Sequence, residues 1–113
     1  MTTVTIEVSD IETTKRRAKA AFAGEPQGCF ITFLSHEELW SVLTANRWSI
    51  LKAMTGAGPL GVRELARRVG RDVKGVHTDA QALVSAGILD KSDEGKLLFP
   101  YDEVRLELVL KAA

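Results

Sequence analysis

Cysteine and aromatic residues are scarce in this sequence, and their scarcity excludes several kinds of site. It has one cysteine, Cys29, and 6% aromatic residues among 113. A single cysteine cannot form an intrachain disulfide or supply a thiolate zinc site. No apolar run approaches the roughly 18 residues of a membrane span. The first residues also lack the basic and apolar regions of a secretory signal. We therefore expect a cytoplasmic protein without a membrane segment.

Patterns typical of catalysis are also missing. The two histidines, His36 and His77, have no cysteine or carboxylate at metal-ligand spacing. The glycine-rich stretch 56–61 lacks the Gly-Lys-Ser/Thr ending of a phosphate-binding loop. Cys29 lies in an apolar run beside Phe30, where we expect an inert buried thiol. The sequence predicts no enzyme, no catalytic residue, no cofactor and no metal.

The chain has no net charge overall, but some of its segments do. Fifteen Lys and Arg balance fifteen Asp and Glu. Residues 61–89 hold five basic and three acidic residues, a net of +2. Residues 90–113 hold four basic and six acidic residues, a net of −2. Because the local field governs docking of a polyanion, a total of zero does not exclude a nucleic-acid partner.

Periodicity predicts alternating strands and helices in the first half of the chain. Apolar residues alternate over 4–8, which favours a strand, and Asp10 can cap a helix over about 11–23. A β-branched and aromatic run predicts a strand over 29–34. Ser35 and Thr44 are placed to cap two further helices. Several large apolar residues are expected in the core, with a dimer surface as the alternative: Phe30, Phe33, Trp40, Trp48, Leu106, Leu108 and Leu110.

Residues 62–83 have the spacing of a helix-turn-helix motif. The first helix begins at Val62, Gly70 suits the tight turn, and Asp72 caps a second helix that ends near Gly87. The expected shared core is Leu65, Val69, Val73 and Val76. Strands over 88–91 and 96–99 flank a turn and predict a β-hairpin. The predicted fold is α+β: a winged helix-turn-helix (helical core plus β-hairpin wing) with an extra N-terminal strand-helix and a C-terminal strand after Pro100, over 105–110.

Four segments carry a family resemblance: 47–52, 62–71, 76–83 and 86–89. Together they resemble the MarR-like and ArsR-like winged helix-turn-helix regulators. The wider run over about 30–110 is similar to a group of small prokaryotic predicted DNA-binding proteins, some of them thought to be antitoxin-type repressors. We therefore divide the chain into an N-terminal strand-helix extension, 1–28, and a winged helix-turn-helix DNA-binding domain with a C-terminal strand, 29–113. The extension is expected to serve dimerisation, by exchange onto a partner chain, or to bind another protein.

The expected DNA contacts lie on both helices and on the hairpin. The outer face of the second helix presents donors and acceptors that can read base edges in the major groove. The first helix of such a motif crosses the DNA backbone, and a hairpin beside it can touch phosphate or minor groove. Gly75 would allow close approach to the groove wall, and Asp79 is placed to orient an arginine. The candidate DNA-binding residues are Arg67, Arg68, Arg71, Lys74, His77, Thr78, Gln81, Lys91 and Lys96.

The sequence thus predicts a transcriptional regulator, a dimeric repressor that binds double-stranded DNA and reads it with helix 72–86. Two alternatives stay open. The first is an antitoxin-type protein that neutralises a partner toxin and autoregulates its operon. The second is a winged-helix protein-interaction module that does not bind DNA.

Overall fold

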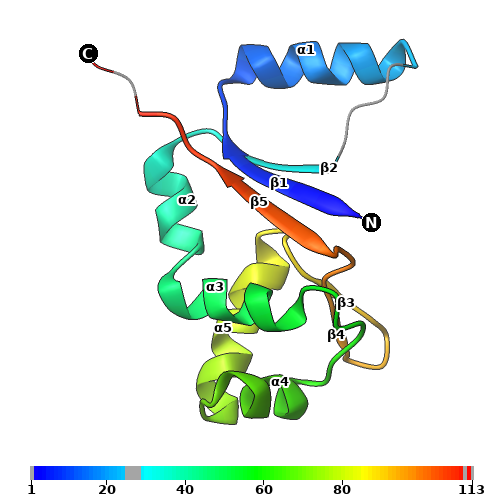
Figure 1. The fold of residues 1–113 in the computed structure, drawn as a ribbon, viewed down its shortest axis with the longest axis vertical. Coiled ribbons are helices and arrows are strands. Elements are labelled where there is room, and N and C mark those ends of the chain that lie inside the picture. Colours follow the sequence, from blue (N-terminus) through cyan, green and yellow to red (C-terminus); the bar gives the residue numbers. More distant parts are fainter. Residues whose placement is uncertain (1, 25–28, 111, 113) are drawn as a thin grey trace.

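Five helices and five strands form the described part of the chain, residues 2–24, 29–110 and 112, in a computed structural model (Figure 1). The protein is a small α+β protein. The strands are β1 (Thr3–Val8), β2 (Cys29–Phe33), β3 (Asp90–Lys91), β4 (Leu97–Leu98) and β5 (Glu103–Glu107). The helices are α1 (Ile11–Phe22), α2 (His36–Val42), α3 (Ala45–Met54), α4 (Val62–Val69) and α5 (Val73–Ser85).

The larger sheet is parallel and has the strand order β2-β1-β5. Its central strand contributes Val4 and Ile6, whose side chains are fully buried. The backbone amides of Asp102 and Glu103 donate to the carbonyl of Thr2, which fixes the register of β5 against β1. The predicted division at residue 28 therefore falls between two neighbouring strands of one sheet. Within this single chain β1 pairs with both β2 and β5, and exchange of the N-terminal strand onto a partner chain stays a prediction.

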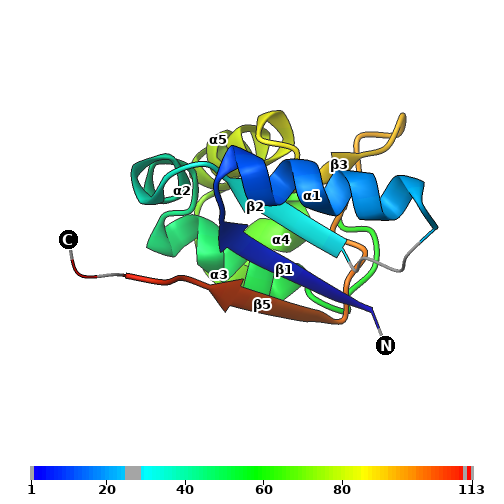
Figure 2. The same cartoon turned by 90° about the horizontal axis from the view of Figure 1, so that it is seen from above.

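Helices cover the two faces of this sheet unequally (Figure 2). Helix α1 lies on one side, and α2 to α5 lie on the other. Arg17 of α1 forms an ion pair with Glu7 of β1, and its guanidinium lies 3.9 Å from the ring centre of Phe30. Glu7 is the one buried charged side chain among the described residues. A charged contact therefore joins α1 to the sheet.

The predicted helix starts are confirmed. The side chains of Asp10, Ser35, Thr44 and Asp72 each accept a hydrogen bond from the backbone amide three residues ahead, at 2.7–3.3 Å. Each satisfies an amide that the first helical turn leaves free. The hairpin is confirmed as the antiparallel pair β3-β4. Leu60 pairs with Leu97 through two backbone hydrogen bonds, which adds a short third segment beside the hairpin.

The core lies between the parallel sheet and α2 to α5, and several expectations for it were wrong. Phe33 is buried and Trp48 packs against the core, as predicted. The expected core residues Phe30, Trp40, Leu106, Leu108 and Leu110 are exposed, and so is Val73. Cys29 is exposed rather than buried. The cause is shared by most of them: β2 and β5 are the two edge strands, and Leu110 lies beyond the end of β5.

In the described residues, no helix is both long and apolar enough to cross a membrane.

Candidate nucleic-acid interface

Helices α4 and α5 pack together across a short turn. Gly70 ends α4 with a φ of +72°, the left-handed conformation that glycine adopts without a steric cost. Leu65 and Val76 face each other's helix from fully buried positions, and Ala66 is nearly as buried. Small and β-branched residues at this crossing let the two helices approach closely. The turn therefore fixes the direction in which α5 presents its outer face.

The outer face of α5 carries the predicted polar side chains. Lys74, His77 and Thr78 are exposed, and Gln81 is partly exposed. The Thr78 hydroxyl donates to the carbonyl of Lys74 at 3.1 Å, so part of its hydrogen-bonding capacity is used within the helix. The ammonium of Lys74 and the amide of Gln81 project from the same helix at a spacing of seven residues. Two helical turns of polar surface are thus available to a ligand.

The hairpin and α5 share one hollow of about 170 Å³. Its polar lining comes from His77 and Gln81 of α5 and from Lys91 of β3, with Gly95 of the β3-β4 turn beside them. Lys96 is exposed at the turn end of the hairpin, directly before β4. The structure therefore brings three of the predicted site residues together from two separate elements.

Arg71 is held against the protein rather than turned fully outward. Its Nη1 lies 2.9 Å from one carboxylate oxygen of Asp79, and Nε of Arg47 lies 3.1 Å from the other. Arg47 also donates to the carbonyl of Val42 at 2.9 Å. One carboxylate thus ties the start of α3 and the end of α2 to the α4-α5 turn. Asp79 was expected to orient an arginine; in the structure it contacts two.

Gly75 has a structural reason to lack a side chain. A Cβ placed there would lie 3.1 Å from Nη2 of Arg71 and 3.1 Å from a carboxylate oxygen of Asp72. Asp72 also accepts a hydrogen bond from the Gly75 amide at 2.9 Å. The glycine therefore leaves room for the helix cap and for the arginine of the Asp79 pair.

Two further predicted contacts lie on α4. Arg67 and Arg68 are exposed, and their Nε atoms lie 3.4 and 3.8 Å from the carboxylate of Glu64. Exposed pairs of this kind are weak, so both guanidiniums stay free to turn toward another anion. In the described residues, no group of three or more His, Cys, Asp or Glu side chains could hold a metal ion.

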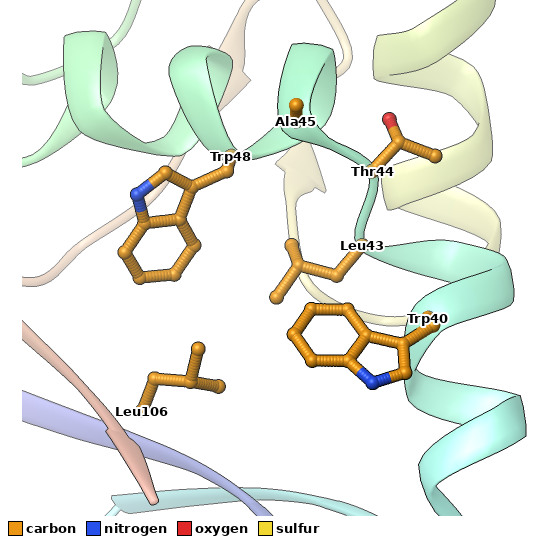
Figure 3. A pocket seen from close by; sticks show the side chains of 6 residues that line it. All are labelled: Trp40, Leu43, Thr44, Ala45, Trp48 and Leu106. Carbon is orange, nitrogen blue, oxygen red and sulfur yellow. The ribbon is translucent and has the colours of Figure 1, made fainter.

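A second surface feature includes residues for which the sequence left a dimer surface open as the alternative to the core. Trp40, Leu43 and Trp48 line a hollow of about 400 Å³ together with Leu106 of β5 (Figure 3). The sequence favours the core for Trp40, Trp48 and Leu106 and leaves a dimer surface as the alternative, and the structure leaves Trp40 and Leu106 exposed. This hollow is mostly apolar and lies on the sheet side of the helical layer, away from the exposed face of α5.

These elements define a small α+β protein in which two helices, a tight turn and a hairpin form one polar surface. The chain belongs to the HVO_A0114 family, because the model of that family matches residues 42–106, more than half of the chain. The matched range runs from the end of α2 to β5, and so includes α4, α5 and the hairpin. No curated protein and no solved structure matches the chain.

Proposed function

We propose that the protein is a sequence-specific DNA-binding transcriptional regulator that acts as a dimer. One observation carries the proposal: Lys74, His77 and Gln81 lie on the exposed face of α5, and the last two share a hollow with Lys91 of the hairpin. Lysine, histidine and glutamine side chains are suited to base edges in the major groove. A repressor is the form of regulator that we propose.

The fold that we propose for this module is a winged helix-turn-helix of the MarR-like and ArsR-like kind. The support is the order of the elements. Helices α4 and α5 are joined by a tight turn, and an antiparallel hairpin with the Leu60 segment follows directly. In such modules the second helix enters the major groove and the first crosses the backbone. Helix α5 would then read bases, while Arg67, Arg68 and the hairpin lysines contact phosphates.

Arg71 has a more limited role in this proposal. Its guanidinium forms a pair with Asp79, and about one quarter of its side chain is exposed. It can contact a phosphate only while it shares or gives up that carboxylate. We therefore expect Lys74 and Gln81 to contribute more to base recognition than Arg71 does.

The test uses DNA from just upstream of the protein's own reading frame. Footprinting locates a bound site, and fluorescence anisotropy measures affinity for it. Lys74→Ala and Gln81→Ala should each weaken specific binding by about 1–3 kcal/mol. Lys15→Ala is the matched control, because Lys15 is an exposed lysine of α1 on the opposite side of the sheet. Binding that neither α5 substitution changes would remove α5 as the recognition helix.

Salt dependence gives an independent measure. If a dimer makes about six phosphate contacts, the logarithm of its affinity should fall by roughly 5 per tenfold rise in salt concentration. A slope near zero would show that backbone contacts are missing and would refute DNA binding.

A second candidate function is favoured by the apolar surface beside α2. Trp40 and Leu34 are each more than half exposed, and Trp40 lines an apolar hollow with Trp48. Exposed apolar patches of this kind mark protein-interaction sites. This surface suits a partner protein, as in an antitoxin that neutralises a toxin. A small protein that co-purifies in equal amount from the native host, and is lost with Trp40→Ala, would favour this candidate.

A further inference from the structure

The outer edge of β5 is unpaired within the described residues. In the sheet order β2-β1-β5, β5 has β1 on one side and no strand on the other. Residues 108–110 continue beyond the end of the sheet (Figure 1). A free strand edge offers a row of backbone donors and acceptors to another strand. Lysine and proline, two residues that protect such an edge, are absent from residues 103–110, and the charged residues of β5 alternate in sign as Glu103, Arg105 and Glu107.

The direction of each backbone group along β5 follows from its pairing with β1. The amide of Glu103 donates to the carbonyl of Thr2 at 3.0 Å, so Glu103 faces β1. Because direction alternates along a strand, Arg105 and Glu107 also face β1. The backbone groups of Val104 and Leu106 therefore point to the free edge, and those of Leu108 would follow if the strand continued by one residue.

We propose that a second copy of this chain pairs with this edge, β5 against β5 in antiparallel orientation, with the twofold axis at Leu106. Leu106 then lies opposite the partner's Leu106, and Val104 lies opposite the partner's Leu108. The backbone groups of Val104 and Leu106 already point outward, so the Leu106 pair can exchange hydrogen bonds, and the Val104–Leu108 pair can do so once pairing extends each strand by one residue. Arg105 lies opposite the partner's Glu107, in the kind of pair whose Cα atoms are closest.

Charge and apolar matching together select this register over its neighbours. With the axis at Leu106, two Arg105–Glu107 pairs face each other across the interface. With the axis at Arg105, two arginines meet, and Glu103 meets the partner's Glu107 on both sides. With the axis at Val104, Arg105 would still lie opposite the partner's Glu103, but Leu106 would lie opposite the partner's Asp102, and Leu108 would reach Pro100, which lies outside β5. Opposite charges stabilise a cross-strand pair and like charges destabilise it.

Apolar surface is placed to add area to the strand pair. Leu106 is 37% exposed and faces the hollow that Trp40 and Trp48 line (Figure 3). Leu108 would lie beside the partner's Val104, which lines a second hollow of about 480 Å³ with Trp48 and Leu51. A stable interface needs on the order of 1,200 Å² of total buried surface. Residues 108–110 of each copy, which continue beyond the sheet, add to the buried surface of this contact.

This pairing has a consequence for the arrangement of the two helical layers. A twofold axis between antiparallel edge strands is perpendicular to the joined sheet. Both copies of α2 to α5 then lie on the same side of a six-stranded sheet. Two helix pairs on one side suit a DNA site with two half-sites. This link between the dimer and a two-half-site DNA sequence rests on the proposed function, which includes the dimer.

The first test is a charge exchange measured by sedimentation without DNA. Arg105 and Glu107 are both largely exposed, and within one chain they form only a surface pair at 2.8 Å. Arg105→Glu and Glu107→Arg should each raise the dimer Kd by roughly tenfold or more, because each places like charges at two symmetric positions. The double substitution should restore the wild-type Kd. Arg16→Glu, an exposed position on α1, is the control and should leave it unchanged.

The second test fixes the register by disulfide cross-linking in a Cys29→Ser background. An equal mixture of Arg105→Cys chains and Glu107→Cys chains should form linked dimers under mild oxidation, while either chain alone should not. Close antiparallel pairs have Cα separations of about 4.5 Å, within reach of a disulfide. Linked dimers of the Arg105→Cys chain alone would place the axis at Arg105 and overturn the register.

Three results would overturn the interface itself. The first is a wild-type protein that stays monomeric at 200 µM, roughly a thousandfold above the Kd of a tight dimer. The second is a wild-type dimer Kd in the single substitutions, and the third is a double substitution that does not restore the wild-type Kd. None of these measurements contains DNA. A failed interface with intact Lys74-dependent DNA binding would therefore leave the proposed function standing. An intact interface without DNA binding would refute the proposed function and leave the interface standing.

Discussion

Removal of the Asp79 carboxylate is the most direct perturbation of the α3-α4-α5 assembly. Its two oxygens contact Arg47 at 3.1 Å and Arg71 at 2.9 Å. The Asp79 side chain is 15% exposed, and the two arginines are 19% and 26% exposed. Asp79→Ala would leave two guanidiniums partly buried without their anion. The loss of stability comes from those two partly buried charges without a counter-ion.

The magnitude lies between two limits. Breaking a buried pair by removal of one partner costs about 3–5 kcal/mol. An exposed pair contributes about 0–1 kcal/mol. Arg47 keeps its hydrogen bond to the carbonyl of Val42, and Arg71 can turn toward water, so both charges relax in part. We expect Asp79→Ala to lower the free energy of unfolding by about 2 kcal/mol, and Tm by about 10 °C.

Urea unfolding followed by far-UV circular dichroism measures this change. With an m-value of about 2 kcal/mol/M, the midpoint should fall by about 1 M. Glu64→Ala is the matched control, because Glu64 also contacts two arginines, but at exposed positions and longer distances. The control should change stability by less than about 0.5 kcal/mol. Equal effects of the two substitutions would refute the argument that burial makes the Asp79 pairs important.

Three further predictions use the same described contacts. Burial, and to a lesser extent the charges of Cys29 and Asp90, raise the pKa of Tyr101 above its usual value of about 10. Since Tyr101 is the sole tyrosine, absorbance at about 295 nm reports its ionisation directly. Folding disfavours the tyrosinate form of Tyr101. The contribution of Tyr101 to stability is therefore complete below pH 10 and is lost as the pH rises toward the folded-state pKa. A titration midpoint below pH 10 would contradict this prediction. Leu65→Ala should lower the free energy of unfolding by about 3 kcal/mol, measured by urea unfolding, because Leu65 is fully buried at the α4-α5 crossing. Asp72→Ala should cost about 1 kcal/mol in the same assay through loss of the α5 cap, and Asp72→Asn should restore most of it.

Local signals in the sequence were sufficient to predict the helices and the hairpin. The caps at Asp10, Ser35, Thr44 and Asp72 act within one helical turn, so the residues that specify them are adjacent in sequence. The left-handed turn at Gly70 is equally local. The outer face of α5 followed from helical periodicity, because the buried positions of α5 leave the others exposed.

The sheet and its edges could not be predicted in the same way. Strand order is set by pairing between residues about 100 positions apart, for which a single sequence carries no local pattern. Alternation of Leu106, Leu108 and Leu110 indicates which face they share but not whether anything covers that face. The pairing of Arg47 with Asp79 was missed for a related reason, since 32 residues separate the two side chains.

The position of β1 between β2 and β5 has a consequence for the order of folding during synthesis. Contacts among α3, α4, α5 and the hairpin join segments that are close in sequence, so this part can form early. The central strand has only β2 available as a partner until β5, which begins 70 residues after the end of β2, emerges from the ribosome. The nascent protein therefore carries a half-finished parallel sheet while those residues are made. Its helical module would be folded before the sheet edge at β5 exists.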